Sequence, residues 1–258
     1  MSSILFEIKE SIATIIFNRP DKLNAFNREM ALSFQEKLDQ CQSNKSIRCV
    51  YITGMGKAFC SGQDLSEVLE TDGMAVNKIL REHYNPIVWK IRTLEKPVVG
   101  AVNGVAAGAG ANIAFACDVV LATESAYFTQ TFSKIGLIPD SGGTYILPRF
   151  IGYQRASALM MLGDRISARD AEKMGMLYKV FPDDIFNEET MKIAEKLSKM
   201  PTKSLAMIKH ALNFSVSNTF EQQLKIEDIY QRRAVETNDY KEGVKAFLEK
   251  REPQFKGD

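Results

Sequence analysis

The sequence predicts a mixed α/β fold made of a core of strands and helices followed by a helical C-terminal region. Short apolar runs bounded by glycine, proline or asparagine, which are typical of buried strands, alternate with stretches whose apolar residues recur at helical spacing. The order strand, turn, helix, strand occurs more than once, and from residue 188 onward almost everything is helix-prone. We therefore expect a core over residues 1–195 and a C-terminal helical region over residues 196–258.

Length and charge limit the classes of protein to which the chain can belong. Its 258 residues are enough to bury a sizeable core, and 45% apolar with 25% charged residues is ordinary globular usage. The formal net charge is +1 and the lysines and arginines form no blocks, so we expect no nucleic-acid partner. No uncharged run approaches membrane-spanning length and the N-terminus lacks a signal-peptide pattern, which predicts a cytoplasmic protein without membrane contact.

The cysteines and histidines indicate neither a metal site nor a disulfide framework. No pair of cysteines has CxxC spacing, and the two histidines do not cluster with them. Cys60 lies beside a glycine-rich turn, but no histidine stands in a recognisable partner motif for a nucleophile. We expect reduced, partly buried thiols. The residues concerned are Cys41, Cys49, Cys60, Cys117, His83 and His210.

The first elements can be assigned in order. Residues 4–17 predict two strands joined near residues 9–11. Apolar residues at helical spacing predict a helix from about residue 26 to 42–45, and residues 48–54 predict a buried strand that ends at a glycine. Residues 66–81 are expected to form a helix with an irregular, mobile lead-in, as in many substrate-gating loops, and residues 84–94 a further helix.

The remaining elements follow the same alternation. Residues 97–104 predict a strand and turn, 106–116 a helix of small residues, and 117–123 another strand. Helices over 149–162 and 168–174 and a strand over 175–181 complete the core, and Pro201 and Pro253 bound the C-terminal helices. These helices are too apolar for free exposure, so we expect them to pack on something, another subunit included. Their apolar residues include Leu205, Ile208, Leu212, Phe220, Leu224, Ile229 and Phe247.

One carboxylate stands in a turn framed by proline and glycine. Asp140 follows Pro139 and precedes Gly142 and Gly143, and Gly-Gly-Thr before an apolar run is typical of a helix entry. Backbone N–H groups would then lie near this acid, which makes Asp140 a candidate catalytic base. The alternative is that Asp140 only caps the following helix, and the segment alone leaves both interpretations open.

Two further glycine-framed turns lie over residues 54–65 and 103–113. Each brings small residues to the start of a predicted helix, where unpaired N–H groups face outward and the helix dipole favours negative charge. Two such donors aimed at one oxygen make an oxyanion hole. Each turn by itself is better explained by close packing of a helix or as a simple turn.

Together, in this order and spacing, these motifs resemble the crotonase (enoyl-CoA hydratase/isomerase) superfamily over essentially the whole chain. The resemblance implies a spiral of repeated ββα units, with C-terminal helices used to form homotrimers or hexamers that are dimers of trimers. It also implies an acyl-CoA substrate, with coenzyme A entering as part of the substrate and no permanently bound cofactor. The segments that carry it are residues 18–20 (Asn-Arg-Pro), 24–26 (Asn-Ala-Phe), 57–64 (Lys-Ala-Phe-Cys-Ser-Gly-Gln-Asp), 108–110 (Gly-Ala-Gly) and 249–255 (Glu-Lys-Arg-Glu-Pro-Gln-Phe).

The resemblance also implies roles for individual residues. The backbone N–H groups of Gln63 and Ala109 would polarise the thioester carbonyl, with Asp140 as the base. The backbone around Lys57 and Ala58 and around residues 63–65 would hold the adenine and pantetheine parts. The residues expected to contact substrate or coenzyme A are Lys57, Ala58, Gln63, Asp64, Leu65, Gly108, Asn112 and Phe132. For Asp64, ordering its own turn is the simpler interpretation.

The superfamily's hydratases carry one glutamate where this chain has Asn112 and another where it has Phe132. An amide and a phenyl ring can neither deprotonate water nor protonate a carbon, so hydration is not expected. Asp140 stands where a subset of isomerases and dehalogenases carry their acid. Phe132 would exclude water from the pocket and thereby raise the pKa of Asp140. The sequence looks most like isomerases of ring-epoxide phenylacetyl-CoA. The alternatives are a 3-enoyl-CoA isomerase and, from another class, a non-catalytic subunit that binds CoA esters.

Overall fold

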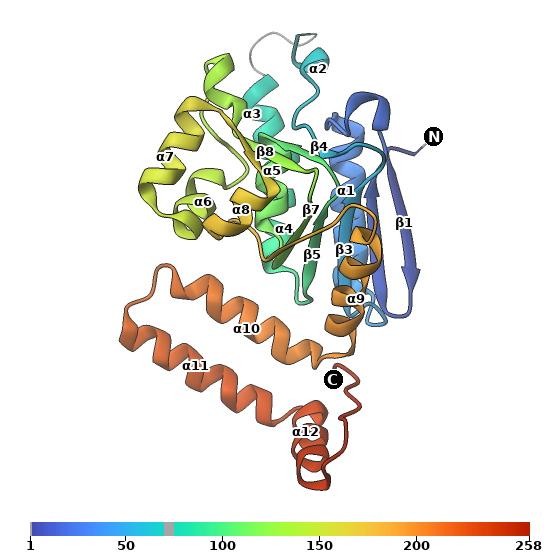
Figure 1. Ribbon diagram of the computed structural model, residues 1–258. Coiled ribbons are helices and arrows are strands. Elements are labelled where there is room, and N and C mark those ends of the chain that lie inside the picture. Colours follow the sequence, from blue (N-terminus) through green and yellow to red (C-terminus); the bar gives the residue numbers. More distant parts are fainter. Residues whose placement is uncertain (1, 70–74) are drawn as a thin grey trace.

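Two β-sheets surrounded by helices form the core of the computed structural model, which describes residues 2–69 and 75–258 (Figure 1). One sheet has six strands in the order β1-β2-β3-β5-β7-β10, and the other has four in the order β4-β6-β8-β9. The strands are β1 (Ile4–Lys9), β2 (Ile12–Phe17), β3 (Cys49–Gly54), β4 (Ala58–Cys60), β5 (Val98–Val102), β6 (Val105–Ala107), β7 (Val119–Thr123), β8 (Tyr127–Thr129), β9 (Arg165–Ser167) and β10 (Lys179–Phe181).

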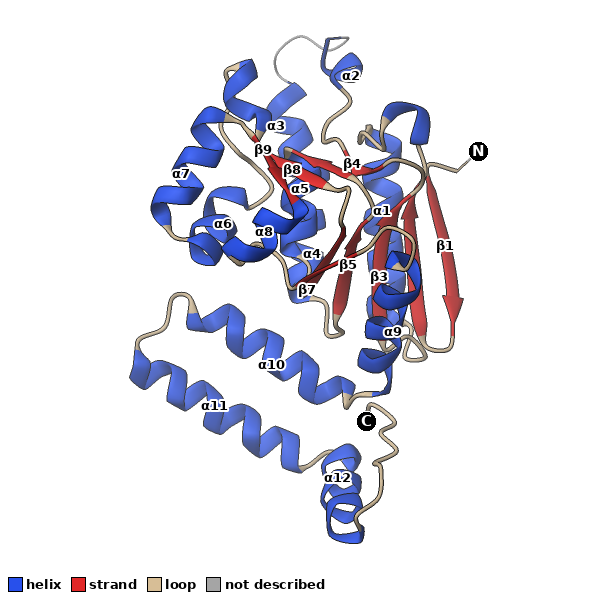
Figure 2. Ribbon diagram, in the orientation of Figure 1, coloured by secondary structure: helices blue, strands red, loops and turns tan. Residues whose placement is uncertain are grey.

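Helices cover the sheets and continue beyond them at the C-terminus (Figure 2). Short 3₁₀ segments occur at η1 (Pro20–Lys22) and η3 (Thr131–Ile135), and η2 (Leu80–Tyr84) is a π-helix. The α-helices are α1 (Arg28–Ser43), α2 (Leu65–Leu69), α3 (Ala75–Ile79), α4 (Asn85–Thr93), α5 (Ala109–Ala116), α6 (Gly143–Ile151), α7 (Tyr153–Leu162), α8 (Ala168–Met174), α9 (Phe186–Lys199), α10 (Thr202–Ser215), α11 (Phe220–Val235) and α12 (Asn238–Glu249). Within the described residues, no helix combines the length and apolar character that crossing a membrane requires.

A strand-strand-helix unit repeats along the core. In the pairs β3–β4, β5–β6 and β7–β8, the first strand joins the six-stranded sheet, the second joins the four-stranded sheet, and a helical segment follows. From β2 to β10 the six-stranded sheet is parallel, as helical crossovers require. The predicted mixed α/β fold is therefore confirmed.

The N-terminal elements form as the sequence predicts. β1 and β2 pair antiparallel from Ile4 opposite Phe17 to Lys9 opposite Ile12, and the turn residues Glu10 and Ser11 both have positive φ, as a type I′ hairpin turn requires. In α1, the Asn27 side chain caps the helix by accepting from Met30 N. The apolar face of α1 is buried against the sheet, where aromatic rings meet edge to face. These rings belong to Phe17, Phe26, Phe34 and Phe59.

The second sheet is the main feature that the sequence patterns did not predict. All four of its strands have three residues, too few for alternation to be visible. The segment 106–116 was expected to be one helix, but it begins within β6 and becomes α5 only from Ala109, after Gly108 turns the chain with a φ of +51°. The helical stretch expected over 149–162 is also divided, because Gly152 adopts a φ of +79° between α6 and α7.

The segment expected to gate the substrate falls partly outside the described residues. The helix with an irregular lead-in that was predicted over 66–81 includes residues 70–74, which are not described. On the two sides of those residues lie the short helices α2 and α3, and α3 continues through the π-helix η2 into α4. The helix predicted over 84–94 is thus confirmed as α4.

The C-terminal helices α10, α11 and α12 extend away from the sheets (Figure 1). The expected boundary at residues 195/196 falls inside α9, and the chain leaves the core at the turn between α9 and α10. An ion pair ties α10 to the core, because the buried Lys209 ammonium lies 2.8 Å from the carboxylate of Asp118, which also accepts from Val98 N. Asp118 therefore anchors the end of a strand to α10.

Candidate active site

Three turns that follow neighbouring strands form the candidate site. β4, β6 and β8 run parallel, so their carboxyl ends lie at one edge of the four-stranded sheet. The turn after β4 carries Gln63, α5 begins after β6 with Ala109, and the segment after β8 leads to Asp140. The topology thus brings the three predicted catalytic positions to the same edge.

Glycines allow these turns to approach each other closely. A Cβ on Gly62 would lie 3.1 Å from the Ala107 carbonyl oxygen and 3.7 Å from the Ala109 nitrogen. A Cβ on Gly110 would lie 2.3 Å from the Cys60 carbonyl oxygen, a distance that no side chain can adopt. The first turn of α5 therefore packs directly on the backbone of β4, which only glycine permits.

Two backbone N–H groups in these turns have no acceptor within the part of the chain that the structure describes. Phe26 pairs with Gln63 in an isolated bridge, whose hydrogen bonds run from Phe26 N to Gly62 O (2.7 Å) and from Asp64 N to Phe26 O (2.9 Å). The Gln63 N–H takes no part in that bridge. Ala109 opens α5, and the first N–H groups of a helix lack acceptors within the helix. Two such donors are suited to hold one developing oxyanion.

Asp140 is a half-buried carboxylate, and the one side-chain hydrogen bond that it forms among the described residues runs from Ser141 Oγ to Asp140 Oδ1 at 2.8 Å. Burial raises the pKa of Asp140, and the Ser141 hydroxyl opposes that rise. The N-cap position of α6 is Gly142, and no side chain caps this helix. The alternative in which the Asp140 carboxylate serves as a helix cap therefore finds no support in the structure.

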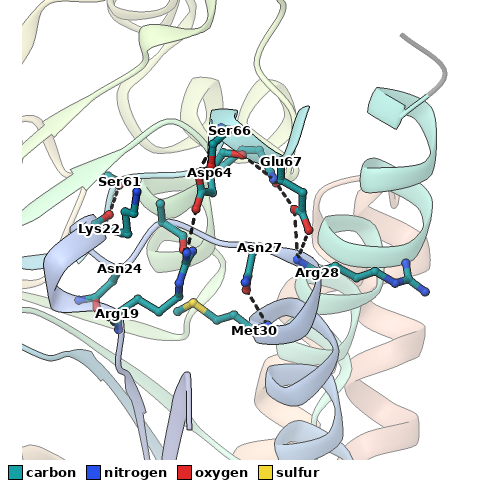
Figure 3. Close-up of polar contacts among 12 residues, drawn as sticks. Arg19, Lys22, Asn24, Asn27, Arg28, Met30, Ser61, Asp64, Ser66 and Glu67 are labelled. Atoms are coloured by element: carbon teal, nitrogen blue, oxygen red, sulfur yellow. Dashed lines mark hydrogen bonds and ion pairs between the residues drawn. The ribbon is translucent and has the colours of Figure 1, made fainter. Parts of the chain in front are cut away.

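The Asp64 carboxylate, unlike that of Asp140, is bound by an arginine as well as by a serine (Figure 3). One of its oxygens lies 2.8 Å from Arg19 Nη2, and the other accepts from Ser66 Oγ at 2.6 Å and from Ser66 N at 3.2 Å. The hydrogen bonds from Ser66, with those from Arg19, hold the pKa of Asp64 below its usual value. Asp64 thus orders the turn that carries Gln63.

The two positions that lack the hydratase glutamates are both buried. Phe132 places its ring beside Gly108, whose added Cβ would lie 3.6 Å from it. Asn112 is fully buried on α5, and its Nδ2 donates to the Asp140 carbonyl oxygen at 2.9 Å while its Oδ1 accepts from Gln130 Nε2 at 2.8 Å. Neither side chain offers an acid at the site.

Comparison with known proteins identifies the family. The model of the enoyl-CoA hydratase/isomerase family matches residues 7–258. The chain belongs to this family. It is 44% identical, over 100% of its own length and 99% of the relative's, to 1,2-epoxyphenylacetyl-CoA isomerase of Escherichia coli K12. It is 34% identical to trans-2-decenoyl-[acyl-carrier-protein] isomerase of Streptococcus mutans, over 98% of both chains.

Solved structures agree with this assignment. The crystal structure of enoyl-CoA hydratase from Bacillus anthracis superposes with a TM-score of 0.95 at 32% identity, covering 99% of this chain and 100% of that one. The fold is thus the crotonase fold of this family, and the protein is an enzyme of the enoyl-CoA hydratase/isomerase family.

The positions expected to hold coenzyme A in this enoyl-CoA hydratase/isomerase lie along the turn before and after β4. Lys57 is exposed just before the strand, Ala58 is buried as its first residue, and Leu65 is half exposed at the start of α2. Gly108 stands between β6 and α5, next to Phe132. Their contact with coenzyme A stays a prediction.

Tyr84 is a residue of the enzyme's site that the sequence patterns missed. It is almost fully buried at the end of the π-helix η2, and its hydroxyl donates to Gln63 Oε1 at 3.0 Å. Burial raises the pKa of Tyr84 well above its usual value, and the negative charge of Asp140 contributes. In the sequence, Tyr84 looks like one more apolar position of a helix. The π-helix that points it inward has no sequence signature.

The four cysteines of the enzyme are buried and free, and burial raises the pKa of Cys60 to about 12. A thiol of this kind is not a nucleophile at neutral pH, which agrees with the sequence analysis. His83 is buried beside Arg28, with its Nδ1 unpartnered in the described part of the chain. In that same part, no cluster of three or more histidines, cysteines or acids could hold a metal ion.

Proposed function

We propose that this enzyme is an acyl-CoA isomerase in which Asp140 moves a proton on a thioester enolate held by the N–H groups of Gln63 and Ala109. One observation carries the proposal: a half-buried carboxylate of raised pKa shares one edge of a sheet with two backbone N–H donors, and within the described residues the carboxylate has no charged partner and the donors have no acceptor. Coenzyme A enters as part of the substrate, and the enzyme carries no permanent cofactor.

The chemistry needs only these groups. Hydrogen bonds to the thioester oxygen acidify the protons α to it, and γ to it in a conjugated system, because they stabilise the enolate. Asp140 accepts the proton as the enolate forms and returns it to another carbon, which moves a double bond from the 3- to the 2-position of an enoyl thioester. Because Asp140 must both accept and release a proton, a raised pKa suits its role.

We propose a ring 1,2-epoxide of a phenylacetyl thioester as the preferred substrate. The relative named 1,2-epoxyphenylacetyl-CoA isomerase, at 44% identity over its whole length, supports this choice. On such a ring, the enolate assists opening of the carbon–carbon bond of the epoxide to give a seven-membered oxepin. A 3-enoyl-CoA substrate is the second candidate, and the relative named trans-2-decenoyl-[acyl-carrier-protein] isomerase supports it.

We expect negligible hydration of crotonyl-CoA. Water addition needs an acid and a base, and the positions of the two hydratase glutamates hold Asn112, with both ends of its amide engaged, and buried Phe132. Each missing general acid or base costs about a hundred- to ten-thousandfold. Hydration at rates typical of central metabolism would show that Asp140 is not the only proton-transfer group.

Asp140→Asn tests the proposal directly. The amide keeps the shape of the side chain but cannot accept a proton, so conversion of the ring epoxide and of the 3-enoyl-CoA should both collapse. Binding of the CoA ester, measured by calorimetry, should persist, with an unchanged circular dichroism spectrum as the control for folding. Activity within a few-fold of the parent enzyme would overturn the role of Asp140. Binding without turnover in the parent enzyme, on every substrate offered, would instead favour the non-catalytic alternative.

We propose that the chain assembles as a homotrimer or a dimer of trimers through its C-terminal helices. α11 buries none of its residues in the single chain. Apolar side chains on these helices are exposed to an extent that soluble monomers rarely tolerate. Examples are Ile208 (55%), Leu212 (60%), Phe220 (80%) and Phe247 (83%). Light scattering at micromolar concentration should give a trimer or hexamer, and a monomer would contradict the proposal.

A further inference from the structure

Two linked hydrogen bonds, one buried and one partly buried, end on the turn that holds the proposed base. Gln130 Nε2 donates to Asn112 Oδ1 at 2.8 Å, and Asn112 Nδ2 donates to the Asp140 carbonyl oxygen at 2.9 Å. Both side chains are almost wholly removed from solvent, at 3% and 0% exposed. The Asp140 carbonyl also accepts from Gly143 N at 2.9 Å within its own turn, so the bond from Asn112 is the one that reaches it from another element.

The last acceptor, the Asp140 carbonyl oxygen, fixes which atom donates and which accepts in both hydrogen bonds. A backbone carbonyl can only accept, so Asn112 must present its Nδ2 to Asp140 and its Oδ1 to Gln130. Gln130 must then present its Nε2, which leaves Gln130 Oε1 buried without a partner in the described residues. A buried unpaired oxygen is unfavourable, so the Gln130 side chain is not explained by stability alone.

The packing around Asn112 leaves it little freedom. A Cβ on Gly143 would lie 2.4 Å from Asn112 Nδ2, so the start of α6 presses directly on the amide. Asn112 also stands on α5 three residues after Ala109, one helical turn from the oxyanion donor. One rigid helix therefore carries both the donor for the oxyanion and the tie to the base.

We propose that Asn112 is a positioning residue that sets the Asp140 turn relative to the oxyanion hole, and that Gln130 acts through Asn112 by fixing the orientation of its amide. This inference rests on the proposed function. It gives Asn112 a different role from the substrate contact expected from the sequence. Errors of about 1 Å in the placement of a catalytic group cost as much as a hundredfold in rate, which sets the size of the effect.

The test is a double-mutant cycle of Asn112→Ala and Gln130→Met, with kcat and KM measured on the substrate that the parent enzyme turns over. Asn112→Ala should lower kcat by about ten- to a hundredfold and change KM less than about threefold, because the substrate contacts remain. Gln130→Met removes only one hydrogen bond and should lower kcat less. In the Asn112→Ala background it should lower kcat no further, because both residues act through one route. If the double variant loses kcat by the product of the two single losses, the residues act independently and the proposed role of Gln130 is wrong.

A matched control separates positioning from stability. Thr190→Val removes two buried hydrogen bonds of Thr190 Oγ1, with Tyr51 Oη and with the Phe186 carbonyl oxygen, each 2.8 Å long and made between α9 and β3 or within α9. It should lower Tm and leave kcat unchanged. If Asn112→Ala lowers Tm as Thr190→Val does but keeps kcat within threefold of the parent, the role of Asn112 is merely structural and the inference is wrong. If Asn112→Ala does not fold, Gln130→Met alone decides, and an unchanged kcat overturns the inference.

Asp140→Asn, measured alongside, distinguishes the two possible failures. If Asp140→Asn stays active, the proposed function itself fails. If Asp140→Asn is inactive while the Asn112 and Gln130 variants keep full kcat, only the positioning inference fails.

Discussion

Two aspartates stand in glycine-framed turns at the same edge of one sheet, and their surroundings give them opposite properties. Asp64 has an arginine on one oxygen and two hydrogen bonds from Ser66 on the other. Within the described residues, the Asp140 carboxylate accepts one side-chain hydrogen bond, from the Ser141 hydroxyl, and forms no ion pair. The pKa of Asp64 is lowered and that of Asp140 is raised.

This difference shows that burial and partners, not residue type, decide which acid can act as a base. Hydrogen bonds from Ser66, together with Arg19, stabilise the ionised form of Asp64, so Asp64 holds a proton weakly and serves to order the turn before α2. Asp140 is partly desolvated, and within the described residues no positive charge pairs with its carboxylate. The carboxylate with fewer partners is therefore the one suited to proton transfer.

The same isosteric substitution in the two turns gives the largest expected contrast. Asp140→Asn should lower kcat about a hundred- to ten-thousandfold, because a general base is lost. Asp64→Asn should lower kcat less than about tenfold, because the amide keeps one acceptor oxygen and the turn is only loosened. Steady-state kinetics on the same substrate measure both. Equal losses in the two variants would mean that Asp64 also takes part in the chemistry.

The pH dependence of the parent enzyme should report the raised pKa of Asp140. A base acts only when ionised, so kcat/KM should fall about tenfold per pH unit below the pKa of Asp140. Because burial raises that pKa, the midpoint of the acid limb should lie above the ordinary value of 3.8. A pH profile with a melting curve at each pH separates titration from acid unfolding. A midpoint at or below 3.8 would contradict a desolvated base.

The sequence patterns predicted the elements whose periodicity is long enough to see. The hairpin over residues 4–17, α1, β5 and α8 lie where they were expected. The four-stranded sheet was missed because its strands have three residues each, and their pairing joins segments far apart in the chain. Contacts of that kind are set by tertiary packing, which local propensity does not carry.

The candidate site was predicted in part for the same reason. Asp140, Gln63 and Ala109 lie in glycine-framed turns, and glycine and proline leave a visible mark in a sequence. Tyr84 and Gln130 left no such mark, because each stands in an ordinary apolar or mixed segment and reaches the site only through the fold. The sequence analysis singled out Asn112, but it did not predict the hydrogen bonds of its amide to Gln130 and to the Asp140 carbonyl.

The smallest expected effects are on stability, and they should have opposite signs in the two turns. A raised pKa of Asp140 means that its contribution to stability is present below the unfolded pKa and is lost as pH rises through the folded pKa. At neutral pH the buried charge therefore destabilises the fold, and Asp140→Asn should raise Tm. The lowered pKa of Asp64 means the reverse, because its contribution is present above the unfolded pKa and is lost as pH falls through the folded pKa.

Asp64→Asn should accordingly lower the free energy of unfolding at neutral pH by about 1 kcal/mol, the net value of a typical hydrogen bond. For a chain of this size that is about 2–4 °C in Tm. Melting curves of both variants and the parent at pH 7 and pH 4 measure the effect. The difference for Asp140→Asn should shrink at pH 4, because Asp140 becomes protonated as pH falls through its raised pKa. The difference for Asp64→Asn should persist at pH 4, which still lies above the lowered pKa of Asp64. A lower Tm for Asp140→Asn at pH 7 would mean that the Asp140 carboxylate stabilises the fold, as Asp64 does, and the contrast between the two turns would then be one of position alone.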